Sequence, residues 1–163
     1  GLILNESIKD NVSLVRQCMQ KGFVLRDRDS RLYMEKMRKE LLIKMGDELD
    51  PCNSLSGGNQ QKVLLGKWLV MSPNILIIDE PTRGIDISAK SEIYATLNKL
   101  AEQGMAILVV SSEMPEVIGM CDRVLIFRGG SLAGELIHDE LTEQRIAYLA
   151  TTSIKETNKT AIS

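Results

Sequence analysis

The stretch that decides the fold of this chain reads Ile75-Leu76-Ile77-Ile78-Asp79-Glu80-Pro81. Its apolar run is short and bounded by chain-breaking residues, which predicts a strand over 75–78 buried on both faces, as in a parallel sheet. Asp79 and Glu80 then stand at the carboxyl end of the strand, where open α/β sheets bind ligands. The first carboxylate can hold Mg²⁺, and the second can orient a water for attack on phosphate. Two solvated acids that open a turn before Pro81 would give the same pattern, so this stretch leaves both interpretations open.

A second informative stretch lies upstream of this strand and reads Leu55-Ser56-Gly57-Gly58-Asn59-Gln60-Gln61-Lys62. Ser56 predicts the N-cap of a helix that runs over 60–71. The two glycines allow backbone N–H groups to approach a ligand closely, and the positive end of the helix favours an anion. A capped helix after a flexible turn is the simpler alternative for these residues.

The rest of the chain alternates helices with strands. We expect helices over 87–103, 115–120 and 140–150, strands over 106–110 and 124–127, and a return strand over 131–136 that Gly129-Gly130 turns into a hairpin. This alternation predicts an α/β domain with a mainly parallel sheet. Residues 1–54 read as a mostly helical region that we expect to form a subdomain, 55–152 as the α/β part, and 153–163 as a polar tail.

Composition excludes several classes of function. The chain has 163 residues, a formal net charge of −2 and 4% aromatic residues, so it offers neither a basic field nor a base-stacking surface for nucleic acid. Three scattered cysteines and one histidine do not form the four-ligand set of a structural zinc site. The sequence contains no run of about 18 apolar residues, so we expect no transmembrane helix in it.

Taken together, the two stretches resemble the signature motif and the Walker B strand of the ATP-binding subunits of ABC transporters. Their order and spacing match that family, and Thr82-Arg83-Gly84-Ile85-Asp86 resembles the segment that leads into its D-loop. Within these motifs, the individual residues are similar to those of the second nucleotide-binding domain of subunits that import ribose, galactose or xylose. Examples are Asn59-Gln60-Gln61-Lys62 and Ser111-Ser112-Glu113-Met114-Pro115-Glu116. The resemblance extends from Gly1 to about Thr152 and implies the C-terminal part of a P-loop NTPase fold of the ABC ATPase type.

The resemblance also implies a role for each motif residue. The signature residues would contact the γ-phosphate of ATP held on a partner domain; they are Ser56, Gly57, Gly58, Asn59 and Gln60. Asp79 would hold Mg²⁺, Glu80 would act as general base or position the water, and Asp86 would lie at the domain–domain interface or simply cap the following helix.

The same family implies partners and a location. A P-loop-bearing nucleotide-binding domain, in the same or a separate chain, would complete the ATP site. The helical region would face membrane permease subunits, which receive sugar from a periplasmic or extracellular binding protein. We therefore expect a peripheral protein at the cytoplasmic face of the cell membrane, with ATP and Mg²⁺ as cofactors and no nucleic acid partner.

Two departures from the family pattern limit these expectations. The phosphate-binding pattern G-x-x-x-x-G-K-[ST] does not occur, because Gly66-Lys67 is followed by Trp68. In the family that loop precedes the region matching Gly1, so we expect it to be missing rather than mutated and this chain alone to be inactive. Ser112 also stands where the family has its switch histidine.

Three functional hypotheses remain open from the sequence. The first is an ATP-hydrolysing subunit, or a fragment of one, of a monosaccharide importer. The second is a non-catalytic half-domain that completes the ATP site of a partner. The third is a soluble ABC-type ATPase unrelated to transport. The net negative charge of the chain and the similarity of its motif residues to those of sugar importers argue against it.

Overall fold

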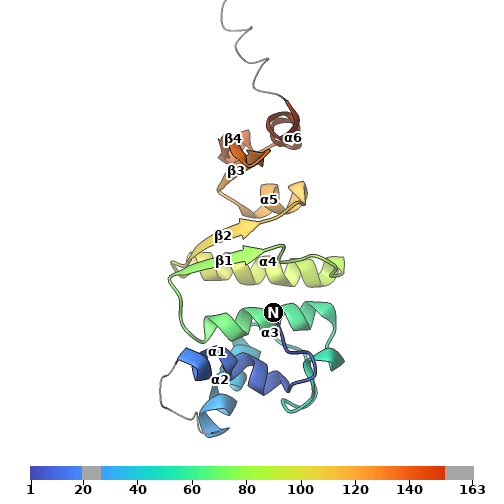
Figure 1. Ribbon diagram of the computed structural model, residues 1–163, viewed down its shortest axis with the longest axis vertical. Coiled ribbons are helices and arrows are strands. Elements are labelled where there is room, and N and C mark those ends of the chain that lie inside the picture. The colour runs from blue at the N-terminus through green and yellow to red at the C-terminus, as the bar shows by residue number, and fades with distance from the viewer. Residues whose placement is uncertain (20–26, 153–163) are drawn as a thin grey trace, which may run out of the picture. The chain divides into compact units, whose positions relative to one another are not determined.

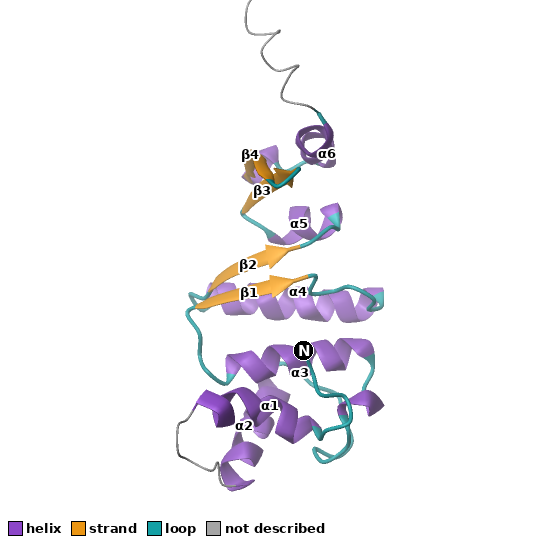
Figure 2. Cartoon of the chain, viewed as in Figure 1, coloured by secondary structure: helices purple, strands orange, loops and turns teal. Residues whose placement is uncertain are grey.

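The computed structural model describes residues 1–19 and 27–152. The chain divides into two compact units, Gly1–Val110 and the part that begins at Ser111, and each unit is described by itself (Figure 1). The expected polar tail over 153–163 lies outside the described residues. After an all-helical start, the chain combines helices and strands, as an α/β fold does (Figure 2).

Three helices build the core at the start of the first unit. α1 (Ile8–Met19) packs against α2 (Asp27–Glu40) and against α3 (Gly57–Leu69). Apolar side chains at helical spacing account for this packing, because Ile8 and Val12, Met34 and Met37, and Val63 are essentially fully buried. The predicted helical character of 1–54 is confirmed, with a short 3₁₀ helix at Cys52–Ser54 ahead of α3. That 1–54 is a subdomain of its own stays a prediction.

The predicted parallel pairing is also present in the first unit. β1 (Ile75–Asp79) pairs with β2 (Ala106–Val110) in parallel, with Ile75 opposite Ala106 and Asp79 opposite Val110. The connection between them is α4 (Ile87–Glu102), which runs alongside the pair in Figure 1 and buries Ile93 and Leu97 completely.

Burial of β1 on both faces was expected, and this prediction is wrong for the described structure. Leu76 and Ile78 are buried, whereas Ile75 and Ile77 are 66% and 67% exposed. Successive side chains of a strand point to opposite faces of the sheet. α4 therefore covers one face of the pair, and no described element of this unit covers the other.

The second unit is a hairpin packed with two helices. β3 (Arg123–Arg128) and β4 (Ser131–Ile137) are antiparallel, as Gly129-Gly130 predicted, and both glycines have positive φ. α5 (Met114–Met120) precedes the hairpin, and a 3₁₀ turn at His138–Glu140 leads into α6 (Glu143–Thr151). The core of this unit is formed by Val124, Ile126, Leu136 and Ile146.

Candidate functional site

Ser56 occupies the N-cap position of α3, as predicted, but its hydroxyl makes no capping hydrogen bond. Its Oγ accepts a hydrogen bond from Nδ2 of Asn59 instead, over 2.9 Å. The backbone N–H groups of the first helical turn are therefore not consumed by the Ser56 side chain. Ser56 and Gly57 are both exposed, so the start of this helix faces solvent and presents donors to an anion.

The two glycines that follow Ser56 do different jobs. A Cβ on Gly58 would come within 2.5 Å of the Cβ of Ala89 on α4, so only glycine permits this close approach of α3 and α4. A Cβ on Gly57 would meet nothing nearer than Cγ2 of Ile85, at 3.7 Å. Gly58 is thus a packing residue, whereas a Cβ at the exposed Gly57 would make only ordinary van der Waals contacts.

The side chains of Asn59 and Gln60 are engaged within the chain. Oδ1 of Asn59 accepts from the backbone N–H of Lys44 over 2.7 Å, while Nε2 of Gln60 donates to the carbonyl of Leu55 over 2.9 Å. The predicted signature residues are thus brought together at one helix start. They differ in what they expose, because Ser56 and Gly57 face solvent while the two amides are bonded to neighbouring backbone.

A group of charged residues behind the signature was not predicted. Lys62, only 2% exposed, donates from Nζ to Oε2 of Glu92 over 2.6 Å and to the carbonyl of Leu42 over 3.1 Å. Oε1 of Glu92 pairs with Nζ of Lys44 at 3.0 Å. The hydrogen bond from Lys62, followed by that from Lys44, lowers the pKa of Glu92. A sequence signal existed, since Lys62 lies on the same face of α3 as the buried Gly66 and Leu69.

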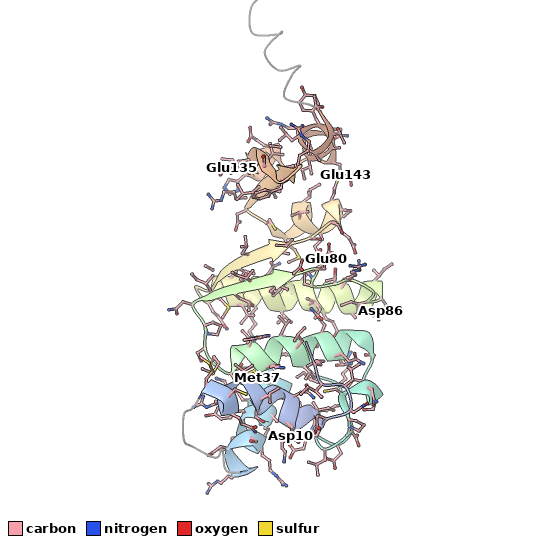
Figure 3. All side chains as sticks on the ribbon, viewed as in Figure 1. Asp10, Met37, Glu80, Asp86, Glu135 and Glu143 are labelled. Carbon is pink, nitrogen blue, oxygen red and sulfur yellow. The ribbon has the colours of Figure 1, made fainter. Side chains whose placement is uncertain are left out.

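The two acids lie at the carboxyl end of β1, as predicted. Asp79 is the last residue of the strand and is exposed. Glu80 has φ 48°, a left-handed conformation that turns the chain sharply, and its N–H donates to the carbonyl of Val110 over 2.8 Å. Its own carbonyl accepts from Arg83, and Figure 3 places Glu80 and Asp86 toward the same end of the unit.

These acids suit a magnesium site that a nucleotide completes. Among residues 1–19 and 27–152 no group of three or more His, Cys, Asp or Glu side chains could hold a metal ion without further ligands. Mg²⁺ ordinarily takes one or two carboxylates, several waters and the phosphates of its nucleotide. An exposed Asp79 with Glu80 beside it therefore fits a shared magnesium–phosphate site and does not fit an all-protein one.

Asp86 caps α4, which confirms one of its two predicted roles. Its Oδ1 accepts from the N–H of Ala89 over 2.9 Å and from Oγ of Ser88 over 2.6 Å. These two bonds, the one from Ser88 first, lower the pKa of Asp86. Because Gly58 approaches Ala89, the starts of α3 and α4 lie together, and the 79–86 segment joins the end of β1 to the same place. The interface role of Asp86 stays a prediction.

In the second unit, the segment that carries Ser112 is held by its neighbours. The Ser111 hydroxyl donates to the carboxylate of Glu116, a residue that is 3% exposed. The N–H of Glu113 donates to the same hydroxyl over 3.1 Å. A buried carboxylate therefore anchors the segment that carries Ser112.

A cavity of about 380 Å³ lies elsewhere in the first unit. It is lined by the C-terminal residues of α2 and α4 and by the turn that precedes β1, including Glu40, Asn74 and Gln103. None of the predicted site residues lines it. The described helices include none with both the length and the apolarity needed to cross a bilayer.

Comparison with known proteins identifies the family. Residues 3–83 match the model of the ABC transporter family. The chain is 46% identical over 153 residues to the ribose import ATP-binding protein RbsA of Oceanobacillus iheyensis, covering 93% of this chain and 31% of that protein. It is 44% identical over 158 residues to the L-arabinose transport ATP-binding protein AraG of Geobacillus stearothermophilus, covering 96% of this chain and 31% of that one. The chain thus spans about a third of the length of these relatives.

Solved structures agree with the sequence relatives. The dimeric, post-hydrolysis structure of the ATP-binding cassette MJ0796 with ADP and Pi superposes with a TM-score of 0.72 at 25% identity, covering 84% of this chain and 59% of that one. The ADP conformation of the cassette MJ1267 gives a TM-score of 0.74 at 17% identity, over 90% of this chain and 63% of that one. Together with the geometry at the start of α3 and at the end of β1, these matches lead to one conclusion: the chain belongs to the ABC transporter family of ATP-binding proteins.

Proposed function

We propose that this chain forms the signature and Walker B part of an ATP-binding subunit in a monosaccharide importer. The observation that carries the proposal is the meeting, at one end of the first unit, of an open helix start at Ser56-Gly57 and of the 79–86 segment. The names of the relatives, which import ribose or transport L-arabinose, support a sugar as the cargo.

The signature residues serve the ATP that a partner domain holds. The exposed start of α3 offers backbone N–H groups and the Ser56 hydroxyl to the γ-phosphate, and the helix dipole favours its negative charge. Gly57 is exposed and has no side chain that would keep a phosphate from its backbone N–H, while Gly58 keeps α3 close to α4. Asn59 and Gln60 complete the element and fix its shape through their internal hydrogen bonds.

The two acids serve the nucleotide of the chain's own domain. Asp79 would hold Mg²⁺, which neutralises charge that develops on the phosphates. Glu80 would accept a proton from the attacking water or orient that water toward phosphorus. Asp86 would lie at the interface between the two domains while capping α4.

The assembly that follows has three kinds of partner. A P-loop-bearing domain supplies the phosphate cradle, membrane permease subunits contact the helical region at 1–54, and a periplasmic or extracellular sugar-binding protein delivers the cargo to them. The chain would work at the cytoplasmic face of the membrane as a peripheral subunit. Its net charge of −2 argues against a nucleic acid partner.

Adding a charge at Gly57 tests the proposal. In a reconstituted transporter, Gly57→Asp should abolish ATP turnover and sugar uptake, because a carboxylate would stand where a phosphate must approach. Asn98→Asp, which adds one carboxylate at an exposed position of α4, is the matched control and should leave both activities unchanged. Wild-type turnover in the Gly57 variant would refute the assignment of the signature.

A non-catalytic half-domain is the second candidate. One feature favours it: Ser112 stands where the family resemblance places a histidine that would contact the γ-phosphate. In that case the chain completes the ATP site of its partner, while Asp79 and Glu80 do no chemistry. Variants of Ser56 and Glu80 separate the two candidates, as argued at the end of the Discussion.

A further inference from the structure

A buried ammonium lies directly behind the signature helix start. Lys62 is on α3, two turns from Ser56, and its side chain is 2% exposed. A buried charge is stable only when it is paired and hydrogen-bonded, because leaving water costs it several kcal/mol. Both requirements are met by Oε2 of Glu92, at 2.6 Å, and by the carbonyl of Leu42, at 3.1 Å.

The segment 42–44, which follows α2, is held to α3 and α4 at three points. Its Leu42 carbonyl accepts from Lys62, its Lys44 ammonium pairs with Oε1 of Glu92 at 3.0 Å, and its Lys44 N–H donates to Asn59 over 2.7 Å. Glu92 thus bridges two lysines with its two oxygens. Loss of its charge would leave Lys62 buried without an anion and would release Lys44.

Asn59 extends this network to the signature. The same amide that accepts from Lys44 through Oδ1 donates through Nδ2 to the Ser56 hydroxyl, over 2.9 Å. An amide held at both ends has one orientation, and that orientation decides which lone pair of Ser56 is used and where its proton can point. The Ser56 hydroxyl is therefore set by a chain of contacts that begins at Glu92.

We propose that Glu92, Lys62 and Asn59 are positioning residues, which fix the Ser56 hydroxyl for donation to phosphate by clamping segment 42–44 against α3 and α4. This inference rests on the proposed function of the signature. Asn59 acts in it through Ser56 rather than by contacting the nucleotide. Glu92, on α4, has the central place because each of its oxygens holds one of the two lysines.

The first test asks whether the clamp exists in solution. Hydrogen exchange of the Lys44 amide should be slowed by its bond to Asn59, and Glu92→Gln should speed that exchange by about tenfold, the scale of one lost hydrogen bond. Glu35→Gln is the matched control, because it breaks an exposed pair of α2, with Lys39 at 2.7 Å, that does not touch α3. Equal exchange in wild type and Glu92→Gln would overturn the proposal.

The second test asks whether the clamp matters for turnover in a reconstituted transporter. Glu92→Gln and Lys62→Met should lower kcat by about tenfold or more with little change in the KM for ATP, as expected when a donor is misplaced rather than removed. Lys62→Arg should keep kcat close to that of the wild type, because a guanidinium can bond to both Glu92 and the Leu42 carbonyl. A variant that only folds less well would give less assembled transporter, but the transporter that does assemble would keep the kcat of the wild type.

The outcomes separate this inference from the proposed function. If Ser56→Arg abolishes turnover while Glu92→Gln turns over like wild type, the clamp is wrong and the signature assignment stands. If Ser56→Arg itself turns over like wild type, the proposed function of the signature is wrong. If Lys62→Arg is as slow as Lys62→Met, the pairing with Glu92 is not what positions Ser56.

Discussion

At the scale of single residues, the adjacent glycines Gly57 and Gly58 should respond very differently to the same substitution. Gly58→Ala places a Cβ 2.5 Å from that of Ala89. Because a Cβ is fixed to the backbone and cannot rotate away, α3 and α4 must separate. Such overpacking costs about 1–3 kcal/mol. Gly57→Ala places a Cβ 3.7 Å from Cγ2 of Ile85, an ordinary contact distance, and should change the free energy of unfolding by less than about 0.5 kcal/mol. Denaturant melts of both variants check this, and equal midpoints would contradict it.

Asp86 gives a prediction about pH. Its folded pKa is depressed by Ser88 and Ala89, so its stabilisation is complete above its unfolded pKa and is lost as the pH falls through the folded one. Asp86→Ala should therefore lower the melting temperature at neutral pH, and its deficit against wild type should shrink in acid. Asp86→Asn keeps a capping oxygen that does not titrate, so its own capping contribution should stay constant with pH. A deficit for Asp86→Ala that is unchanged down to about pH 2 would disprove the assignment.

The residue scale also shows where sequence reasoning stops. The cap at Asp86 could be predicted, because its partners lie within three positions along the chain. The partners of Asn59 could not, since Lys44 is fifteen residues away and is brought near only by the packing of α2 on α3. For the same reason Ser56 was correctly placed at an N-cap while its actual bond, to Asn59, was missed.

At the scale of elements, the end of α2 offers a stability test. Leu42 follows the helix with φ 52°, while the N–H of Ile43 reaches back to the carbonyl of Arg38 over 3.1 Å, which is the Schellman pattern that favours glycine. The Leu42 side chain is 69% exposed and contributes little packing. Leu42→Gly should raise the free energy of unfolding by about 0.5–1 kcal/mol, the left-handed strain less the entropy of glycine.

Leu42→Ala is the control for this change, because it removes the same exposed side chain and keeps the Cβ that causes the strain. Thermal melts of the two variants isolate the backbone effect. If Leu42→Gly were no more stable than Leu42→Ala, the strain at this helix end would not be real.

Most elements could be predicted, and the misses have physical causes. β1, α4 and β2 were found within about one residue, because breakers bound each of them. α3 starts at Gly57 rather than Gln60, since contact with α4 outweighs the poor helix propensity of two glycines. α6 starts at Glu143 rather than near 140, because 138–140 close a 3₁₀ turn first. The prediction that β1 is buried on both faces was wrong. An apolar run shows only that a strand is able to be buried on both faces, whereas actual burial depends on which elements pack against it.

At the scale of the whole molecule, the functional residues of this chain would serve two different composite ATP sites. By the proposed function, each ATP is held by the P-loop of one domain and the signature of the other. This chain would give Ser56 and Gly57 to the site of its partner, and Asp79 and Glu80 to its own. The first pair stands at an intact, exposed helix start. The second pair would serve a site in which, by the family resemblance, Ser112 stands at the position of the switch histidine.

We therefore expect Ser56→Arg to cost more activity in a reconstituted transporter than Glu80→Gln. Removing a preorganised donor beside the transferred phosphoryl group costs about 10²–10³ in rate, and the arginine would also fill the space that Gly57 leaves open. Glu80→Gln keeps the size of the side chain and its left-handed backbone, so it tests the carboxylate alone. If the chain's own site is degenerate, that carboxylate has little chemistry to do, and turnover should fall only slightly. ATP hydrolysis and sugar uptake, measured for both variants in the same preparation, decide the matter. Abolition by Glu80→Gln with near-normal turnover in Ser56→Arg would mean that the catalytic site is the one this chain's acids serve; it would rule out the non-catalytic half-domain and contradict the role assigned to Ser56.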